Sequence, residues 1–194
     1  MKTAVIVGSG GQDGRILREV LSADHNIIGI EKNSTRGTID RWQSNVDITS
    51  YKEVDNLIKS VKPDEVFHLA AYHHSSVSIP QNVRILFQNS YATNVLSLVN
   101  FLEAIRCSSP ETKLFYASSC LIFADTSTKI QIEETPFCPN EVYGITKLDG
   151  LLTCRYYRES YGLFASTGIL YNHESEYRTE DFVSQKIIEG ALAI

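Results

Sequence analysis

The feature that most constrains this chain is a short apolar run that leads directly into a glycine-rich turn. Residues 4–7 (Ala-Val-Ile-Val) have the composition of a buried strand, and Gly8-Ser9-Gly10-Gly11-Gln12-Asp13-Gly14 follows without a break. From Arg15 to Leu21 the apolar residues then recur at the spacing of one helical face. Small residues at such a turn let the backbone approach a pyrophosphate, whose charge the amides of the helix N-terminus stabilise. The alternative is a turn that serves the fold alone. We predict dinucleotide contacts at Gly8, Gly11, Gln12, Asp13 and Gly14.

The rest of the chain repeats this alternation of short apolar runs and longer helical patterns. Strands are expected at residues 26–30, 46–48, 65–69, 113–117 and 163–170, and helices at residues 51–60, 81–106, 141–161 and from 181 onward. Pro63 ends one helix, and Gly162 follows the end of another. We therefore predict one α/β domain over residues 1–194, a Rossmann doubly wound parallel sheet with helices on both faces and strand order 3-2-1-4-5-6.

Composition excludes several classes of protein. Hydrophobic residues make up 43% of the chain and charged residues 21%, which argues against disorder. The formal net charge of −5 gives no general attraction to nucleic acid or to an anionic membrane, so we predict neither as a partner. No apolar run approaches the roughly 20 residues that span a bilayer, and no signal peptide is visible. The four widely spaced cysteines favour reduced thiols in a cytoplasmic protein.

Charged residues after the second expected strand bear on the choice of cofactor. A carboxylate at Glu31 is placed to accept hydrogen bonds from a ribose diol and to repel a 2′-phosphate, which favours NAD. Lys32 and Arg36 follow closely and are alternatives that would hold that phosphate, as in NADP. The third interpretation is that all three are solvated loop charges. The cofactor is therefore predicted as NAD or NADP, with a slight preference for NAD.

Tyr143 and Lys147 are the candidate catalytic pair. They lie four residues apart in the expected helix, so the phenol and the ammonium share a face. The cation, together with the positive ring of an oxidised nicotinamide, is expected to lower the pKa of the phenol, which then exchanges a proton with a sugar hydroxyl. Ser118 and Ser119 end a strand at the sheet edge where ligands bind, and we expect Ser119 to orient the same hydroxyl. A strand-end turn or helix cap is the alternative for both serines.

Two other clusters carry no function in this interpretation. His73 and His74 follow a strand, but no carboxylate or cysteine lies at ligand spacing, so we predict no metal site and expect loop residues beside the cofactor. The run Arg155-Tyr156-Tyr157-Arg158 lies in a helix of an acidic chain, which favours a solvated face or a subunit contact over nucleic-acid binding.

The chain resembles the extended short-chain dehydrogenase/reductases, specifically the GDP-mannose 4,6-dehydratase branch of the NAD-dependent epimerase/dehydratase family. The resemblance covers essentially the whole chain. It is carried by Gly11-Gln12-Asp13-Gly14, His68-Leu69-Ala70-Ala71, Val77-Ser78, residues 134–144 (ETPFCPNEVYG) and residues 168–175 (GILYNHES). It implies action on a nucleotide-diphosphate sugar.

The resemblance assigns roles position by position. The glycine-loop residues match the cofactor loop, and Asp47 and Ile48 match the pair that flanks adenine. Leu69, Ala70 and Ala71 match the strand end beside the cofactor ribose. Ser119, Tyr143 and Lys147 match the catalytic hydroxyl, the general base and its lysine partner. Asn172 and Glu174 match the approach to the sugar nucleotide. The helices near 81–106 and 141–161 match those that pair across a two-fold axis in this family, which implies a homodimer with seam candidates Leu98, Leu102, Leu152 and Tyr156.

The chain also departs from the dehydratase pattern. Leu121 stands where the dehydratases carry a glutamate that removes the C5 proton during elimination of water, and leucine has no titratable group. Glu133 and Glu134 are substitutes that nothing in the sequence places in the site. Epimerases and reductases of the family carry apolar residues at this position. Lys32 and Asn33 replace much of the basic cluster associated with NADP. The family continues beyond residue 194 into a region that binds the nucleotide base, so we expect a truncated substrate-binding region.

These observations lead to two functional hypotheses. The first is a nucleotide-sugar enzyme of the epimerase/dehydratase type, which oxidises a GDP-linked hexose at C4 and ends in dehydration, epimerisation or reduction. The second is a non-catalytic dinucleotide-binding module, favoured by Leu121 and by the expected truncation.

Overall fold

The computed structural model describes residues 1–32, 43–44, 46–73, 82–124, 127, 130–178 and 182–192. Within this described part, six parallel strands form one sheet in the order β3-β2-β1-β4-β5-β6, which confirms the predicted topology. The strands are β1 (Lys2–Val7), β2 (His25–Ile30), β3 (Gln43–Ser44), β4 (Glu65–His68), β5 (Lys113–Ser119) and β6 (Ala165–Leu170). Asn33, Arg36, His74 and Val77-Ser78 lie outside the described residues.

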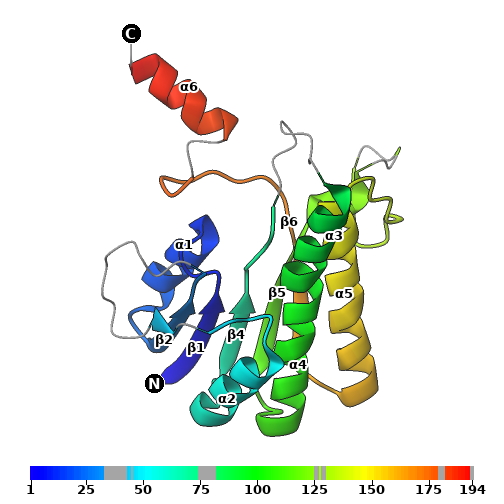
Figure 1. Cartoon of the computed structure of the whole chain (residues 1–194). Coiled ribbons are helices and arrows are strands. Elements are labelled where there is room, and N and C mark those ends of the chain that lie inside the picture. Colours follow the sequence, from blue (N-terminus) through cyan, green and yellow to red (C-terminus); the bar gives the residue numbers. More distant parts are fainter. Residues whose placement is uncertain are drawn as a thin grey trace.

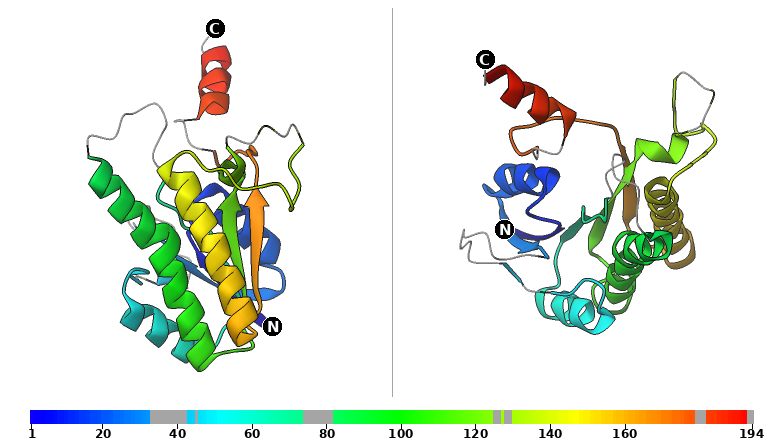
Figure 2. Two further views of the ribbon diagram at one scale, coloured as in Figure 1. Left: turned by 90° about the vertical axis from the view of Figure 1, so that its right-hand side faces the viewer. Right: turned by 45° about the horizontal axis from the view of Figure 1, so that its top comes forward.

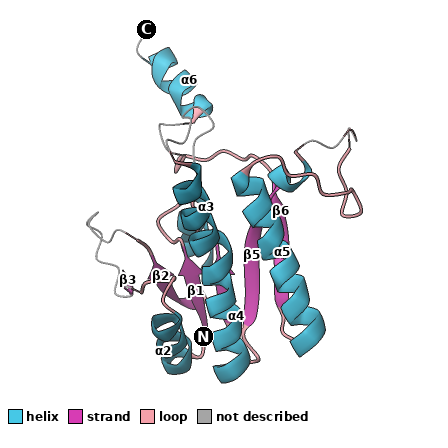
Figure 3. Cartoon of the chain, turned by 45° about the vertical axis from the view of Figure 1, so that its right-hand side comes forward, coloured by secondary structure: helices cyan, strands magenta, loops and turns pink. Residues whose placement is uncertain are grey.

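Helices cover both faces of the sheet, as predicted (Figures 1 and 2). They are α1 (Gln12–Leu21), α2 (Tyr51–Val61), α3 (Val83–Tyr91), α4 (Ser97–Ser108), α5 (Val142–Tyr161) and α6 (Val183–Leu192), with the short turns η1 (Ala92–Leu96) and η2 (Cys120–Phe123). Helix α1 covers one face, while α2, α4 and α5 pack side by side on the other (Figure 3). Helix α6 extends away from this layered body (Figure 1).

The core lies between the sheet and the layer formed by α2, α4 and α5. Strand β1 is apolar and fully buried from Ala4 to Val7, as expected for a central parallel strand. Facing helix residues such as Phe101 and Ile58 have no exposed surface. Gly162 ends α5 with φ of +69°, a left-handed conformation that glycine adopts without strain, so the predicted stop is confirmed.

One expectation about local structure is wrong. Residues 46–48 form no strand, because the Asp47 carboxylate accepts hydrogen bonds from the Thr49 amide (2.9 Å) and the Thr49 hydroxyl (2.7 Å) and turns the chain into α2. The flanking residues Val46 and Ile48 are still half-buried against the core, which explains their apolar character. The predicted helical stretch at 81–106 is confirmed from Val83 to Ser108, with the π-helical turn η1 between α3 and α4.

The proposed dimer seam is also partly wrong. Leu98 and Leu102 have no exposed surface, because they point from α4 into the core of their own subunit. Leu152 and Tyr156 on α5 are 43% and 55% exposed, so these two remain available to a second copy. No helix in the described ranges combines the length and apolarity needed to cross a bilayer.

Candidate active site

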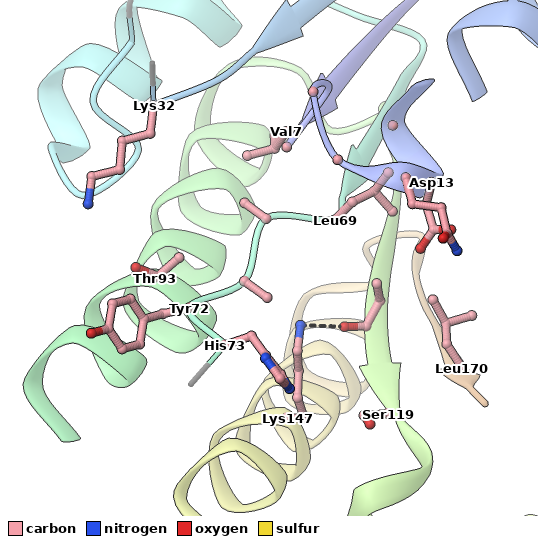
Figure 4. Close-up of a pocket in the computed structure, with 18 of the residues that line it drawn as sticks. Val7, Asp13, Lys32, Leu69, Tyr72, His73, Thr93, Ser119, Lys147 and Leu170 are labelled. Atoms are coloured by element: carbon pink, nitrogen blue, oxygen red, sulfur yellow. Dashed lines mark hydrogen bonds between the residues drawn. The ribbon is translucent and has the colours of Figure 1, made fainter. Parts of the chain in front are cut away.

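A cavity of about 1040 Å³ lies at the carboxyl ends of the strands, where ligands bind in open parallel sheets. Most of the predicted site residues line it, although they come from seven different segments. They are Gly8, Gly11, Gln12, Asp13, Gly14, Glu31, Lys32, Asp47, Ile48, Leu69, Ala70, Ala71, Ser119, Tyr143, Lys147 and Asn172. Lys32 lies at the opposite end of the cavity from Ser119 and Lys147 (Figure 4), in keeping with the order of their strands.

The glycine loop is shaped by close backbone contacts. The amide of Gly8 donates to the carbonyl oxygen of Ile30 at 2.9 Å, and Gly8 has φ of +90°. A Cβ at Gly14 would lie 2.4 Å from the Gly8 carbonyl oxygen, so a side chain at Gly14 would displace backbone. Helix α1 begins directly after Gly11, and the first amides of a helix have no partner within it. The loop and these amides together form a cradle that fits a pyrophosphate.

Glu31 packs directly over this loop. A Cβ at Gly10 would lie 2.1 Å from the Glu31 carboxylate, so the glycine is needed for the carboxylate to lie where it does. Further along the same wall, hydrogen bonds from Thr49 hold the pKa of Asp47 below its usual range. This end of the cavity therefore offers carboxylate acceptors, with Lys32 as the cation beside them.

Lys147 is fixed inside the wall formed by β5 and α5. Its ammonium donates to the Ala117 carbonyl oxygen at 2.8 Å (Figure 4), and its side chain is 1% exposed. Burial lowers the pKa of Lys147 to about 7. The Ser118 hydroxyl donates to the Lys147 carbonyl oxygen at 3.0 Å, so β5 and α5 are bonded in both directions at this point.

Tyr143 lies one turn earlier in α5 and lines the same cavity. The Lys147 Nζ atom is 5.5 Å from the centre of the Tyr143 ring, and the His73 ring contacts that ring edge-on with centroids 5.0 Å apart. Burial, followed by the nearby Cys120, Glu141 and Asp13, raises the pKa of Tyr143 to about 12. Lys147 is not among the causes of this shift, so the predicted joint effect of the lysine and an oxidised nicotinamide on the pKa of Tyr143 stays a prediction.

Ser119 both caps a turn and lines the cavity, and the sequence had allowed either position for it. Its Oγ atom accepts a hydrogen bond from the Leu121 amide at 3.2 Å and so caps the turn η2. The residue also lines the cavity, and its hydroxyl proton is not used in the cap. The cap therefore fixes the Ser119 side chain without preventing it from donating to a ligand.

Asn94 is a buried residue of the site region that the sequence did not indicate. Its side chain accepts from the Tyr72 amide at 2.8 Å and donates to the Thr146 hydroxyl at 2.9 Å. The main-chain carbonyl oxygen of Asn94 accepts a hydrogen bond from the Tyr116 hydroxyl at 3.0 Å. The π-helical turn η1 places Asn94 between β4, β5 and α5, where it holds three walls of the cavity in register. No apolar periodicity signals such a turn.

Leu121 lines the cavity, whereas neither of its suggested substitutes does. Glu133 and Glu134 are exposed and lie outside the set of described residues that line the cavity. The Leu121 carbonyl oxygen would be 2.6 Å from a Cβ at Gly144, so the start of α5 packs closely against this residue. The position thus contributes an apolar side chain to the site.

The segment after β6 forms the remaining wall, and here the structure differs most from the expectation. Asn172 lines the cavity, but Glu174 does not. The Glu174 carboxylate instead accepts from the Ser184 hydroxyl at 2.6 Å and pairs with Arg178 at 3.6 Å. Arg178 and Phe182, which the sequence did not single out, line the cavity, as do Thr93, Tyr72 and His173.

Comparison with known proteins agrees with this architecture. A family model for GDP-mannose 4,6 dehydratase matches residues 5–194. The GDP-mannose 4,6-dehydratase of Vibrio cholerae is 33% identical, over all of this chain and 55% of its own length. GDP-mannose 4,6 dehydratase 2 of Arabidopsis thaliana is 35% identical, over 96% of this chain and 54% of its own. The chain therefore spans about half the length of these curated relatives.

A solved structure gives the same result for the fold. The dTDP-glucose 4,6-dehydratase of Bacillus anthracis, in complex with NAD, superposes with a TM-score of 0.81 at 18% identity, over 100% of this chain and 62% of its own. The similarity of fold and the family match over nearly the whole sequence agree. This chain belongs to the GDP-mannose 4,6-dehydratase family.

Proposed function

We propose that this chain forms the cofactor-binding and catalytic part of an enzyme that oxidises a GDP-linked hexose at C4 with NAD or NADP. The observation that carries the proposal is one cavity that contains both the glycine loop and the side chains of Ser119, Tyr143 and Lys147. The glycines of the loop leave a cradle that a Cβ would fill, which fits a dinucleotide. The family membership supports the class of substrate.

In this mechanism the chain's own residues orient the substrate and move one proton. Ser119 donates to the oxygen of the C4 hydroxyl, and Tyr143 takes the proton from that hydroxyl. An oxidised nicotinamide held by the glycine loop would supply the hydride acceptor for C4, and its positive charge would lower the pKa of Tyr143 from about 12. Lys147, held by the Ala117 carbonyl oxygen, keeps the start of α5 at a fixed distance from β5.

Hydride transfer is the direct test. The protein is mixed with GDP-mannose and either NAD or NADP, and reduced cofactor is followed by absorbance while 4-keto sugar is followed by mass spectrometry. The proposal predicts that the wild type forms both products in a single turnover and that Tyr143→Phe forms them at least about 100-fold more slowly. Reduced cofactor without a keto sugar, or turnover that Tyr143→Phe retains, contradicts it.

We propose NAD as the preferred cofactor, because the Glu31 carboxylate lies over the glycine loop. Binding of NAD and NADP by calorimetry tests this preference. Glu31→Gln keeps the size of the side chain and removes the charge that repels a 2′-phosphate. NADP should gain affinity relative to NAD in this variant, and an unchanged ratio would contradict the role.

The final product depends on Leu121, which supplies no base for removal of the C5 proton. We infer that the wild type stops at a 4-keto sugar, or continues by epimerisation or reduction, without losing water. Leu121→Glu restores a carboxyl group at this place in the cavity. Loss of water from the product only in this variant supports the inference, and equal loss in the wild type refutes it.

A second candidate function is a dinucleotide-binding module without catalysis. The observation that favours it is Leu121, an apolar side chain that lines the cavity and supplies no base. Binding of NAD with no hydride transfer to or from any GDP-sugar would favour this candidate over the enzyme.

We also propose a cytoplasmic homodimer. All four thiols are unpaired in the structure, which suits a reducing compartment. A shallow groove between α4 and α5 is lined by Val95, Val99, Leu152 and Tyr156, among others, and offers an apolar seam. Sedimentation should give a dimer for the wild type and a monomer for Tyr156→Glu. A monomeric wild type at micromolar concentration would exclude this seam.

A further inference from the structure

His73 brings an ionisable side chain to the end of the cavity where the proposed oxidation takes place. The residue follows β4 and lines the cavity, and its ring meets the Tyr143 ring edge-on with centroids 5.0 Å apart. The centroid of the Phe182 ring is 6.3 Å from that of His73. Figure 4 shows His73 and Lys147 at the same end of the cavity, away from Lys32. Proton transfer at the C4 hydroxyl through Tyr143 does not use this imidazole.

A chain of hydrogen bonds fixes the backbone before His73 relative to Tyr143. The Tyr72 amide donates to the Asn94 side chain at 2.8 Å, and the Asn94 side chain donates to the Thr146 hydroxyl at 2.9 Å. The Thr146 hydroxyl donates in turn to the Tyr143 carbonyl oxygen at 3.0 Å. Asn94 and Thr146 have no exposed surface, so water does not compete for these bonds. The position of His73 beside Tyr143 is therefore set by the buried wall of the cavity.

The carboxylates of the cavity are engaged elsewhere. Among the described residues, those that line it are Asp13, Glu31, Asp47 and Glu53. Asp13 meets the His173 ring at 2.6 Å, and Glu53 accepts from the Asp47 amide at 2.8 Å. Glu31 packs over the glycine loop. Imidazole is the side chain that accepts and returns a proton most readily near neutral pH, so His73 is the candidate base next to Tyr143.

We propose that His73 is a second acid–base residue, which removes and returns the proton of a carbon next to C4 once C4 carries a keto group. The inference rests on the proposed function, because the keto group must form first. In that function Ser119 and Tyr143 hold the C4 oxygen. The carbons C3 and C5 are each one bond from C4, so a group in contact with Tyr143 is placed beside one of them.

A keto group acidifies the hydrogens on both neighbouring carbons, because the carbanion is stabilised as an enolate. An imidazole nitrogen of His73 takes the proton, the electron pair of the broken C–H bond forms a double bond to C4, and the carbonyl π pair moves to the C4 oxygen. The Ser119 hydroxyl donates to that oxygen. Return of a proton from the imidazolium restores the keto sugar with no net oxidation, and the exposure of His73 lets a solvent proton replace the original one. Every hydroxyl group is kept, which agrees with a wild type that does not lose water.

The test measures deuterium at C3 and C5 when the whole chain turns over GDP-mannose with NAD or NADP in D₂O. NMR and mass spectrometry give the deuterium content per molecule of 4-keto sugar, which separates this step from the rate of oxidation. His73→Gln removes the base, and His73→Glu replaces it by another base. His25→Gln is the matched control, because His25 starts β2, pairs with Asp24 and is not among the described residues that line the cavity. Circular dichroism of each variant establishes that the fold is retained.

The wild type and His25→Gln are expected to incorporate deuterium at C3 or C5, and the carbon that exchanges is the one that His73 faces. His73→Gln is expected to lower the rate of incorporation about 10²- to 10⁴-fold, with partial recovery in His73→Glu. Three results overturn the role of His73 while the proposed function stands: a wild-type keto sugar without deuterium, equal incorporation in His73→Gln, or an equal loss in both His73 variants. If the wild type forms no 4-keto sugar, both fall.

Discussion

Two walls of the same cavity are built in opposite ways. The wall made by β5 and α5 holds Lys147 and Tyr116 with almost no exposed surface and bonds the two elements through main-chain carbonyl groups. The wall made by the segment after β6 is held to α1 by polar contacts between half-exposed side chains, such as His173 and Asp13. Helix α6, which follows, has no buried residue.

This difference shows which wall of the cavity is supported by the hydrophobic core. The proposed catalytic groups lie on the wall that the core stabilises, so their geometry is a consequence of folding itself. Asn172, which is expected to meet the sugar nucleotide, lies on the wall that polar contacts hold. Because exposed ion pairs contribute little to stability, this second wall should open at a lower free energy than the first.

The largest effect should come from the chemistry of the buried wall. Tyr143→Phe removes the hydroxyl that accepts the substrate proton, so turnover should fall by about 10²- to 10⁴-fold. NAD binding should remain within about twofold, because ring packing is kept. Stopped-flow absorbance and calorimetry measure the two quantities. If the affinity for NAD fell by the same factor as turnover, the role of Tyr143 would be cofactor binding and not proton transfer.

The next largest difference should be in the free energy of unfolding, between variants of the buried core and variants of helix α6. Leu102→Ala removes a fully buried side chain and should lower the free energy of unfolding by about 2–5 kcal/mol. Ile187→Ala on α6, where the residue is 65% exposed, should change it by less than about 0.5 kcal/mol. Urea unfolding measures both variants, and comparable losses would show that α6 is part of the cooperative core.

Lys147 should make stability depend on pH. Burial lowers its pKa to about 7 in the folded chain, well below the ordinary value of about 10.5, so the unfolded chain binds this proton more readily. Stability contributed by this group should therefore rise as the pH increases from about 7 to 10.5. Lys147→Met should lack this rise in urea unfolding at pH 7, 8 and 9. Identical slopes in both proteins would show that the lysine is not desolvated.

The smallest effect should be a pH-dependent opening of the second wall. Hydrogen bonding to the Tyr171 carbonyl oxygen, followed by bonding to Asp13, raises the pKa of His173. Both ring nitrogens face acceptors, so the contact is complete only in the charged imidazolium. The stabilisation is therefore present below about pH 6.5 and is lost as the pH rises through the raised pKa.

Amide hydrogen exchange across residues 171–178 checks this opening, with β5 as the internal reference. The difference in protection between the segment and β5 should widen with pH in the wild type and stay constant in His173→Gln. A segment whose protection follows that of β5 at every pH would show that the two walls open together.

The sequence predicted the parts of the site that depend on strand ends and glycines. Gly8, Gly14 and Ser119 were found because small residues after a strand and hydroxyls at its end mark the carboxyl edge of a parallel sheet. Tyr143 and Lys147 were found from their spacing on one helical face. Convergence of these segments in one cavity follows from the sheet order, which the alternation of elements also predicted.

Other parts could not be found because they depend on side-chain contacts between distant segments. Leu98 and Leu102 have the spacing of an interface, but spacing does not tell whether a helix faces its own sheet or a second copy. Arg178 enters the cavity because Phe182 and Glu174 orient it, which no pattern encodes. The raised pKa of Tyr143 follows from burial, which a sequence does not display.

The central claim is that one cavity places a dinucleotide between the glycine loop and the pair formed by Tyr143 and Lys147. Nuclear Overhauser contacts between bound NAD and the protein, with labelled tyrosine and isoleucine, measure this placement most directly. The account predicts contacts from nicotinamide protons to the Tyr143 ring and from adenine protons to Ile48. Bound NAD that shows neither contact, or that shows them exchanged, would contradict it.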